Sequence, residues 1–172
     1  GSAAPQPAGF SSKFQAMLEG KPVVGIPTNL DGEFAKEEVR RQFGDAVKSH
    51  KRVASLGAKE FDTLVSVVSA CCRNIDSSKP SDFTCAKSLL KAGSLYSRKD
   101  GRSPKFLRDA VCDFDVWKEP NFWDDWYSHR VNKAIEKHQA EGGQDVEGVV
   151  ESVIVHVGKT MVEWGVSEAI VK

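Results

Sequence analysis

The sequence predicts an all-α fold, a single-domain bundle of six to eight helices that runs from about residue 13 to the end of the chain. Two patterns indicate this class. Apolar residues recur at intervals of three and four in successive segments, and glycines and prolines separate those segments. The length of 172 residues suits one domain. Such a chain buries roughly 70% of its unfolded surface, so its core needs no disulfide or metal.

The N-terminal region is expected to be a disordered leader or tag remnant (1–12), followed by a single helical domain (13–172). The leader is rich in Ala, Pro and Ser, and it lacks the charged start and apolar stretch of a signal peptide. Its opening Gly-Ser is typical of a cleaved tag, so we expect a piece of a longer protein. A short helix is predicted over 13–19, followed by an extended connector over 20–32 that contains several prolines and glycines.

Three helices are predicted in the first half of the domain. Residues 33–56 carry an apolar face with charges opposite it, and Gly57 is expected to end that helix. The clearest helix spans 61–75, where one apolar stripe covers four turns. The segment 76–80 interrupts the pattern, and a further helix is predicted over 81–96 with Ser81 as its cap.

The second half is predicted to contain a short helix opened by Pro104 and two long helices. Pro120 favours an extended Glu119, and Asn121 is a suitable N-cap for a helix that continues to the Gly142-Gly143 pair. The last segment, 146–164, is rich in valine, which favours strands. Its apolar residues nevertheless keep helical spacing over nineteen positions, so we predict a helix.

Charge and cysteine usage narrow the class of protein. Lys plus Arg and Asp plus Glu each number 24, so the net charge is zero, which argues against a general nucleic-acid binder. A chain with zero net charge is expected to make at most peripheral contact with a membrane. No apolar run approaches the roughly 20 residues of a membrane-spanning helix. The four cysteines fall inside helical patterns rather than in turns, which favours reduced thiols and a cytoplasmic location. They are Cys71, Cys72, Cys85 and Cys112.

Catalytic, metal and cofactor motifs are not readable in the sequence. Gly158-Lys159-Thr160 lacks the glycine five positions earlier that a phosphate-binding loop needs. No cysteine pair has zinc spacing, and none is followed by the arginine of a Cys-x5-Arg phosphatase loop. The four histidines, His50, His129, His138 and His156, are scattered over three predicted helices. We therefore predict no catalytic residue, no metal and no cofactor.

An aromatic segment over residues 113–127 is the densest feature of the chain. Its six large rings alternate with five acids, which oppose phosphate and disfavour nucleic-acid stacking. One hypothesis is a partner-binding anchor, with at least one tryptophan exposed. Trp117 is the favoured candidate because it lies before the Pro120 break. The alternative is that the rings fill one end of the bundle. The candidate residues are Phe114, Trp117, Phe122, Trp123, Trp126 and Tyr127.

A basic face is the second candidate surface. Lysines and arginines gather in the second half of the helix predicted over 33–56 and just beyond it. They could meet an acidic partner or anionic headgroups, or they could simply be solvated near a helix end. The residues are Lys48, Lys51, Arg52 and Lys59. Ser103, before Pro104, is either a phosphorylation site or part of a plain turn.

Three stretches resemble a known family. They are Lys79 to Leu90 running on to Leu95-Tyr96, then Val116 to Trp123, then Met161 to Val166. The pattern is similar to the helical region of the SET-binding factors, which are myotubularin-type pseudophosphatases with a Rab-exchange module, and of related small cytosolic proteins. The resemblance implies a non-catalytic helical module of signalling or membrane-trafficking proteins. This chain has neither the exchange module nor the phosphatase loop, so no catalytic residue is carried over.

The function expected from these observations is a non-catalytic protein-interaction module, an adaptor or scaffold that binds a protein partner and is not an enzyme. Two alternatives stay open at this point. One is an enzyme whose site brings together separated residues, such as Cys85 or Cys112 and a histidine. The other is a peripheral membrane-binding domain that uses the basic residues.

Overall fold

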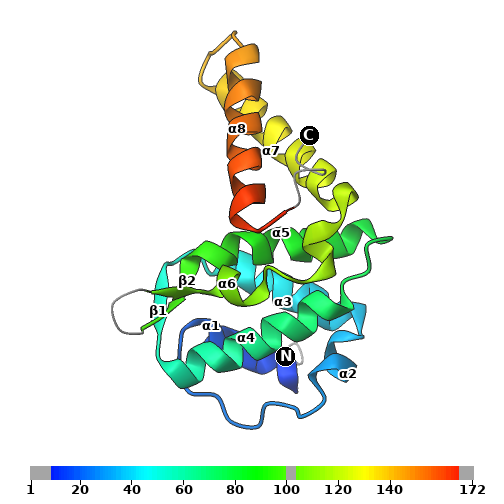
Figure 1. Ribbon diagram of the computed structural model, residues 1–172, viewed down its shortest axis with the longest axis vertical. Helices are drawn as coiled ribbons and strands as arrows, with labels where there is room; N and C mark the ends of the chain where they lie inside the picture. The colour runs from blue at the N-terminus through cyan, green and yellow to red at the C-terminus, as the bar shows by residue number, and fades with distance from the viewer. Residues whose placement is uncertain (1–8, 100–103, 167–172) are drawn as a thin grey trace, which may run out of the picture. The chain divides into compact units, whose positions relative to one another are not determined.

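The structure, a computed structural model, describes residues 9–99 and 104–166 and confirms the predominantly helical fold (Figure 1). Within those ranges it contains eight α-helices, two short 3-10 helices and one small three-stranded sheet. The chain divides into two compact units, residues 1–114 and 115–172. The single helical domain expected over 13–172 stays a prediction.

The elements of each unit follow in chain order. The first unit contains η1 (Phe10–Lys13), α1 (Phe14–Leu18), α2 (Leu30–Phe34), α3 (Glu37–Ser49), β1 (Ala54–Leu56), α4 (Ala58–Asn74), α5 (Pro80–Leu95), β2 (Tyr96–Arg98), β3 (Lys105–Phe106) and α6 (Leu107–Val111). The second contains η2 (Asp115–Lys118), α7 (Pro120–Ala140) and α8 (Glu147–Glu163). No helix in the described ranges combines the length and hydropathy that a membrane crossing requires.

The N-terminal leader differs from its prediction at residues 10–12. Phe10 begins η1 and is buried, with its ring 4.9 Å from that of Phe14 and 5.7 Å from that of Phe34. Edge-on aromatic contacts of this kind add to the burial of apolar area, which orders this part of the leader. Residues 1–8 lie outside the described ranges.

The single helix predicted over 33–56 is wrong, because the chain forms α2, α3 and β1 there. Lys36 is extended at the break between the two helices. The Arg40 guanidinium donates to the carbonyl oxygens of Phe34 and Ala35 at 2.7 and 3.0 Å. These bonds satisfy carbonyls at the C-terminal end of α2, so a buried side chain stabilises the interruption.

The three-stranded sheet was not predicted. Its strand order is β1-β2-β3, with Ala54 opposite Tyr96 in the parallel pair and Ser97 opposite Phe106 in the antiparallel pair. Strands of two or three residues are too short to show the alternation that identifies a strand in sequence. The sheet joins the connector after α3 to the chain on either side of residues 100–103.

The core of the first unit is built on α4 and on the contact of α3 with α5. Most of the stripe predicted on 61–75 is buried, with Leu64 fully covered, whereas Val65 and Ile75 are half-buried. Gly44 of α3 faces Cys85 of α5, where an added Cβ would lie 3.0 Å from the Cys85 Cα. Only glycine permits so close an approach of these two helices.

The second unit is built around a pair of helices, α7 and α8, which pack side by side and are joined by a short turn (Figure 1). Pro120 is the first residue of α7, and Glu119 before it is extended, as predicted; the N-cap is therefore Glu119 rather than Asn121. Gly142, with φ of +82°, ends the α7 side of the turn. The helix predicted over the valine-rich segment is confirmed as α8.

Candidate functional site

The three tryptophans of the aromatic segment are buried, which corrects the prediction that at least one is exposed. Trp117 is 1% exposed, and Trp123 and Trp126 are each 3% exposed. Phe122 is also buried, whereas Phe114 and Tyr127 are half-buried.

Ring contacts within the second unit explain this burial. The Trp117 ring lies 4.6 Å from that of Trp164, and 5.3 Å from that of Phe122. Trp123 donates its indole N–H to the Trp117 carbonyl oxygen at 2.8 Å and packs edge-on against Trp126. The rings therefore form an aromatic core in which Trp164, forty-seven residues after Trp117 in the printed sequence, is a partner that sequence reasoning did not assign.

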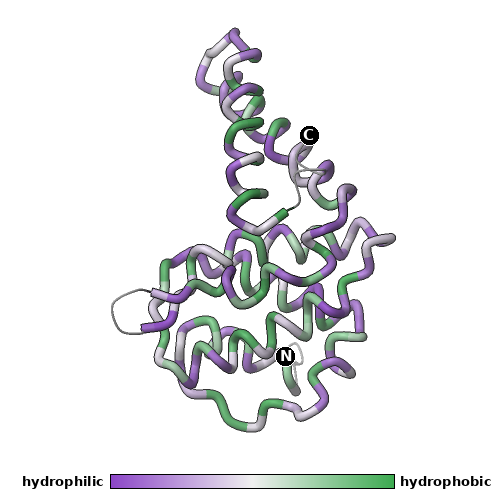
Figure 2. Tube along the Cα trace, viewed as in Figure 1, coloured by the Kyte–Doolittle hydropathy of each residue, from purple (hydrophilic) through white to green (hydrophobic). Residues whose placement is uncertain are grey.

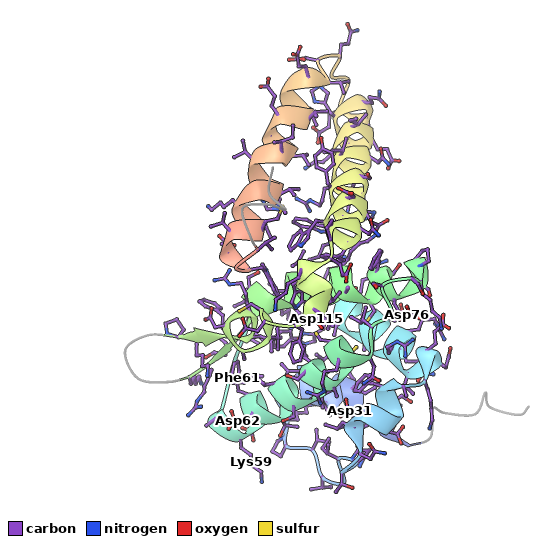
Figure 3. The ribbon with its side chains drawn as sticks, turned by 45° about the vertical axis from the view of Figure 1, so that its right-hand side comes forward. Asp31, Lys59, Phe61, Asp62, Asp76 and Asp115 are labelled. Atoms are coloured by element: carbon purple, nitrogen blue, oxygen red, sulfur yellow. The ribbon has the colours of Figure 1, made fainter. Side chains whose placement is uncertain are left out.

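The basic residues are exposed but do not lie on one continuous helix. Lys48 is in the last turn of α3, Lys51 and Arg52 are in the connector after it, and Lys59 is in the first turn of α4. Lys59 points away from α4 into solvent (Figure 3). None of the four forms an ion pair with another described residue. Ser103 lies outside the described residues.

The thiols have the character of core side chains. The Cys85 sulfur lies 3.6 Å from that of Cys71, and both are buried. Burial raises the pKa of the Cys71 and Cys72 thiols well above the usual range. Burial, followed by the charge of Asp113, also raises the pKa of the half-buried Cys112. A raised pKa keeps a cysteine as the weakly reactive thiol at neutral pH. Among the described residues, no cysteine hydrogen bonds a histidine.

His50 has a structural position. Its Nδ1 lies 2.6 Å from the hydroxyl oxygen of buried Tyr96, and the two rings stack. This contact ties the end of α3 to β2 and gives a polar partner to a hydroxyl that would otherwise be costly to bury. In ranges 9–99 and 104–166, no three His, Cys, Asp or Glu residues are grouped as metal ligands would be.

An exposed apolar surface on α8 was not predicted. Val153, Val157 and Met161 are buried, as the sequence pattern indicated, but Ile154, Val155 and Val162 are 52%, 70% and 68% exposed. We call these last three the α8 outer face. Hydrophobic residues recur along the whole helix (Figure 2). The signal in the sequence was that apolar residues occupy more of this helix than one face requires.

A cleft of about 590 Å³ lies between α7 and α8, and its α8 lining residues neighbour the α8 outer face. Its polar side chains are Arg130 and His138 of α7, Asp145 of the connecting turn, and Ser152 and His156 of α8. Burial, followed by the charge of Arg130, lowers the pKa of His156. The sequence pattern alone did not connect the histidines with Arg130. Positions 130 and 138 are two turns apart on one ridge of α7, and this spacing is the signal that could have placed Arg130 and His138 together.

The described residues define a predominantly helical protein, with exposed apolar side chains on α8 and a polar cleft between α7 and α8. The chain belongs to the SBF2 family, described as "Myotubularin protein", whose sequence profile matches residues 16–160. This match confirms the resemblance to the SET-binding factors and myotubularin-type proteins. The chain matches no curated protein and no solved structure.

Proposed function

We propose that this chain is a non-catalytic adaptor module of a cytoplasmic protein of the myotubularin type, and that it binds a protein partner through the α8 outer face. The observation that carries the proposal is the exposure of three large apolar side chains, Ile154, Val155 and Val162, on one helix. Burying one such side chain is worth about 1.5–3 kcal/mol, so leaving three in water is unfavourable without a partner. The aromatic segment supports the core of the module instead of forming the anchor.

The spacing of the outer face suits a helical partner. Ile154 and Val162 are two turns apart on the same side, with Gly158 midway between them. A Cβ added at Gly158 would meet nothing within 4 Å, so a second helix can come close there. Helix recognition of this kind uses apolar anchors at intervals of three and four.

The charges beside the outer face define the chemistry of the partner. Glu147 and Glu151 are exposed on the turns that precede Ile154 and Val155. A partner helix with an apolar stripe, and with Lys or Arg at the end that meets these two acids, complements both features. We therefore propose an amphipathic helix with a basic end as the bound segment.

The non-catalytic assignment is supported by the chemistry of the thiols. The pKa values of Cys71, Cys72 and Cys112 are raised, and the buried Cys85 has another cysteine as its polar neighbour. A nucleophilic cysteine needs the opposite environment, in which a nearby base or cation lowers its pKa.

The test compares the wild-type chain with the double variant Val155→Ser/Val162→Ser. Proteins captured by the wild type from cytosol are identified, purified and titrated against both forms by calorimetry. Because two apolar contacts are lost, we expect the double variant to bind at least about tenfold more weakly with an unchanged melting temperature.

The matched control is Val53→Ser, which changes a valine 76% exposed in the first unit. We expect this variant to bind the purified partner like the wild type. Equal affinity of the wild type and the double variant, or an equal loss in the control, would overturn the proposal.

A further inference from the structure

We propose that the cleft between α7 and α8 is a binding site for a small organic anion, which presents a phosphate or carboxylate group to Arg130 and His156. None of the residues that line the cleft belongs to the α8 outer face. Three properties of the second unit support this site: space between two packed helices, a guanidinium and an imidazole donor at that space, and apolar walls beside them.

Small residues from both helices line the cleft. They are Ala134 of α7 and Gly148 and Ser152 of α8, and the last two are exposed, so the cleft is open to solvent. On α8, Val153 at the wall of the cleft is buried, as are Val157 and Met161. Leucine-sized side chains at the three small positions would fill the cleft, because side chains between packed helices normally leave little empty space.

Arg130 supplies the fixed positive charge of the cleft. Within residues 9–99 and 104–166 it forms no ion pair, and its guanidinium lies 6.0 Å from the centre of the Trp126 ring. A guanidinium held over an aromatic face is preorganised for two parallel hydrogen bonds to an oxyanion. The charge of Arg130 is therefore available to a ligand.

His156 adds a second donor from the opposite helix. Its ring also lies 6.0 Å from the Trp126 ring, so both groups lie beside the same indole. The charges that act on His156 are those of Arg130 on α7 and of Lys159 and Glu163 on its own helix. His138 lines the far part of the cleft, where its Nε2 is buried without a hydrogen-bond partner under the turn at Gly143.

Asp145 is the one group among the cleft residues that opposes an anion. Its carboxylate lines the cleft and accepts a long hydrogen bond of 3.5 Å from the backbone N–H of Gly148 at the start of α8. Removing its negative charge therefore favours an anion in the cleft. A variant that lacks the Asp145 charge is therefore expected to bind an anion more tightly than the wild type.

The size and walls of the cleft indicate an organic ligand. About 590 Å³ is within the usual range for small-molecule sites and is far larger than a bare phosphate ion. Val149 and Val153 supply apolar wall beside the polar groups. An anion with an apolar body fits both parts of the lining.

The experiment titrates the full chain with phenyl phosphate, benzoate and benzyl alcohol, and follows backbone amide resonances by NMR. We expect at least one of the two anions to bind saturably, with the largest shifts at residues 145–156 and around Arg130. A dissociation constant near or below 1 mM is about what ligands of this size reach. Tighter binding of phenyl phosphate assigns a phosphate ligand, whereas tighter binding of benzoate assigns a carboxylate.

Three variants test the assignment. Arg130→Met is expected to weaken binding of the better anion about tenfold or more, and Asp145→Asn to tighten it. Lys133→Met removes one exposed positive charge from the same helix outside the cleft, and it should leave the affinity within about twofold. The proposal is overturned if neither anion saturates these shifts, if benzyl alcohol binds as tightly, or if Lys133→Met weakens binding as much as Arg130→Met.

Discussion

Arg40 and Asp82 form a buried ion pair, with Nη2 and Oδ2 3.0 Å apart and a second contact from Nε to Oδ1 at 3.2 Å. The side chains are 5% and 3% exposed. Asp82 also accepts the backbone N–H of Asp76 at 2.7 Å, and Arg40 donates to the end of α2. One pair therefore joins α2, α3, α5 and the loop before α5, and it fixes the chain at the break between α2 and α3.

Removing one member of this pair is expected to be costly. Asp82→Ala leaves the Arg40 guanidinium buried without its carboxylate, which costs about 3–5 kcal/mol of unfolding free energy. The apolar double variant Arg40→Met/Asp82→Leu is expected to recover much of that loss, because both buried charges are then absent. Urea unfolding measures both. As a control, Asp45→Ala breaks the exposed pair with Arg41 and should leave the midpoint unchanged.

Leu64 lies at the centre of the α4 stripe and is fully buried. Leu64→Ala is expected to lower the free energy of unfolding by about 2–5 kcal/mol, because it removes buried methyl groups and leaves a cavity. Urea unfolding checks this, with Val24→Ala as a control at a position 85% exposed. An unchanged midpoint for Leu64→Ala would place the core face of α4 elsewhere.

The aromatic core of the second unit makes Trp117 a stability residue. Trp117→Ala is expected to cost about 3–5 kcal/mol through lost packing on Trp164 and Phe122. Trp123→Phe keeps a ring but removes the N–H that the Trp117 carbonyl accepts, and it should cost about 1–3 kcal/mol. Thermal unfolding distinguishes the two. A Trp117→Ala variant that melts like the wild type but loses its partner would restore the exposed-anchor hypothesis.

The four thiols are expected to react in two classes. At pH 7 a thiol reagent should modify Cys112 slowly in the folded chain, because it is half-buried and its pKa is raised. Its rate should increase as the pH rises and the thiolate fraction grows. Cys71, Cys72 and Cys85 should react only in denaturant. As a control, the variant Cys112→Ser should show no reaction in the folded state. Rapid labelling of Cys85 in the folded chain would instead support the alternative that the protein is an enzyme.

The pKa of His156 is expected to respond to Arg130. Burial lowers this pKa first, and the positive charge of Arg130 lowers it further, because each disfavours the imidazolium. Arg130→Met removes the second cause, so the pKa of His156 should rise while staying below its ordinary value. An NMR titration of the ring protons measures the shift. The exposed Lys133→Met variant should not move it, and an equal pKa in Arg130→Met and the wild type would place the guanidinium away from the ring.

The helices with a long, regular period could be read from the sequence alone. The stripe at 61–75 predicted α4, and sustained spacing over 146–164 identified α8 as a helix in spite of its valines. These predictions succeed because a helix presents residues three and four apart on one face, whatever that face packs against. The family resemblance likewise rested on local runs and was confirmed.

The sequence could not show which apolar residues find a partner. Trp117 has no periodic pattern around it, and its burial depends on Trp164, which is remote in the sequence. The break after Phe34 depends on Arg40 donating across it, and the ion pair with Asp82 joins residues forty-two positions apart. The three-residue strands form only because the chain brings them side by side.

By itself, then, the sequence determined the helical class, most of the long helices and the family, because periodicity and local runs are properties of neighbouring residues. Tertiary structure alone decided that the tryptophans are core and that Ile154, Val155 and Val162 are surface. It also decided that Arg130 and His156 share one cleft. Whether a side chain is exposed, and whether two distant residues lie together, depends on which helix faces meet. Side-chain packing between distant segments decides this, and local sequence patterns do not contain that information.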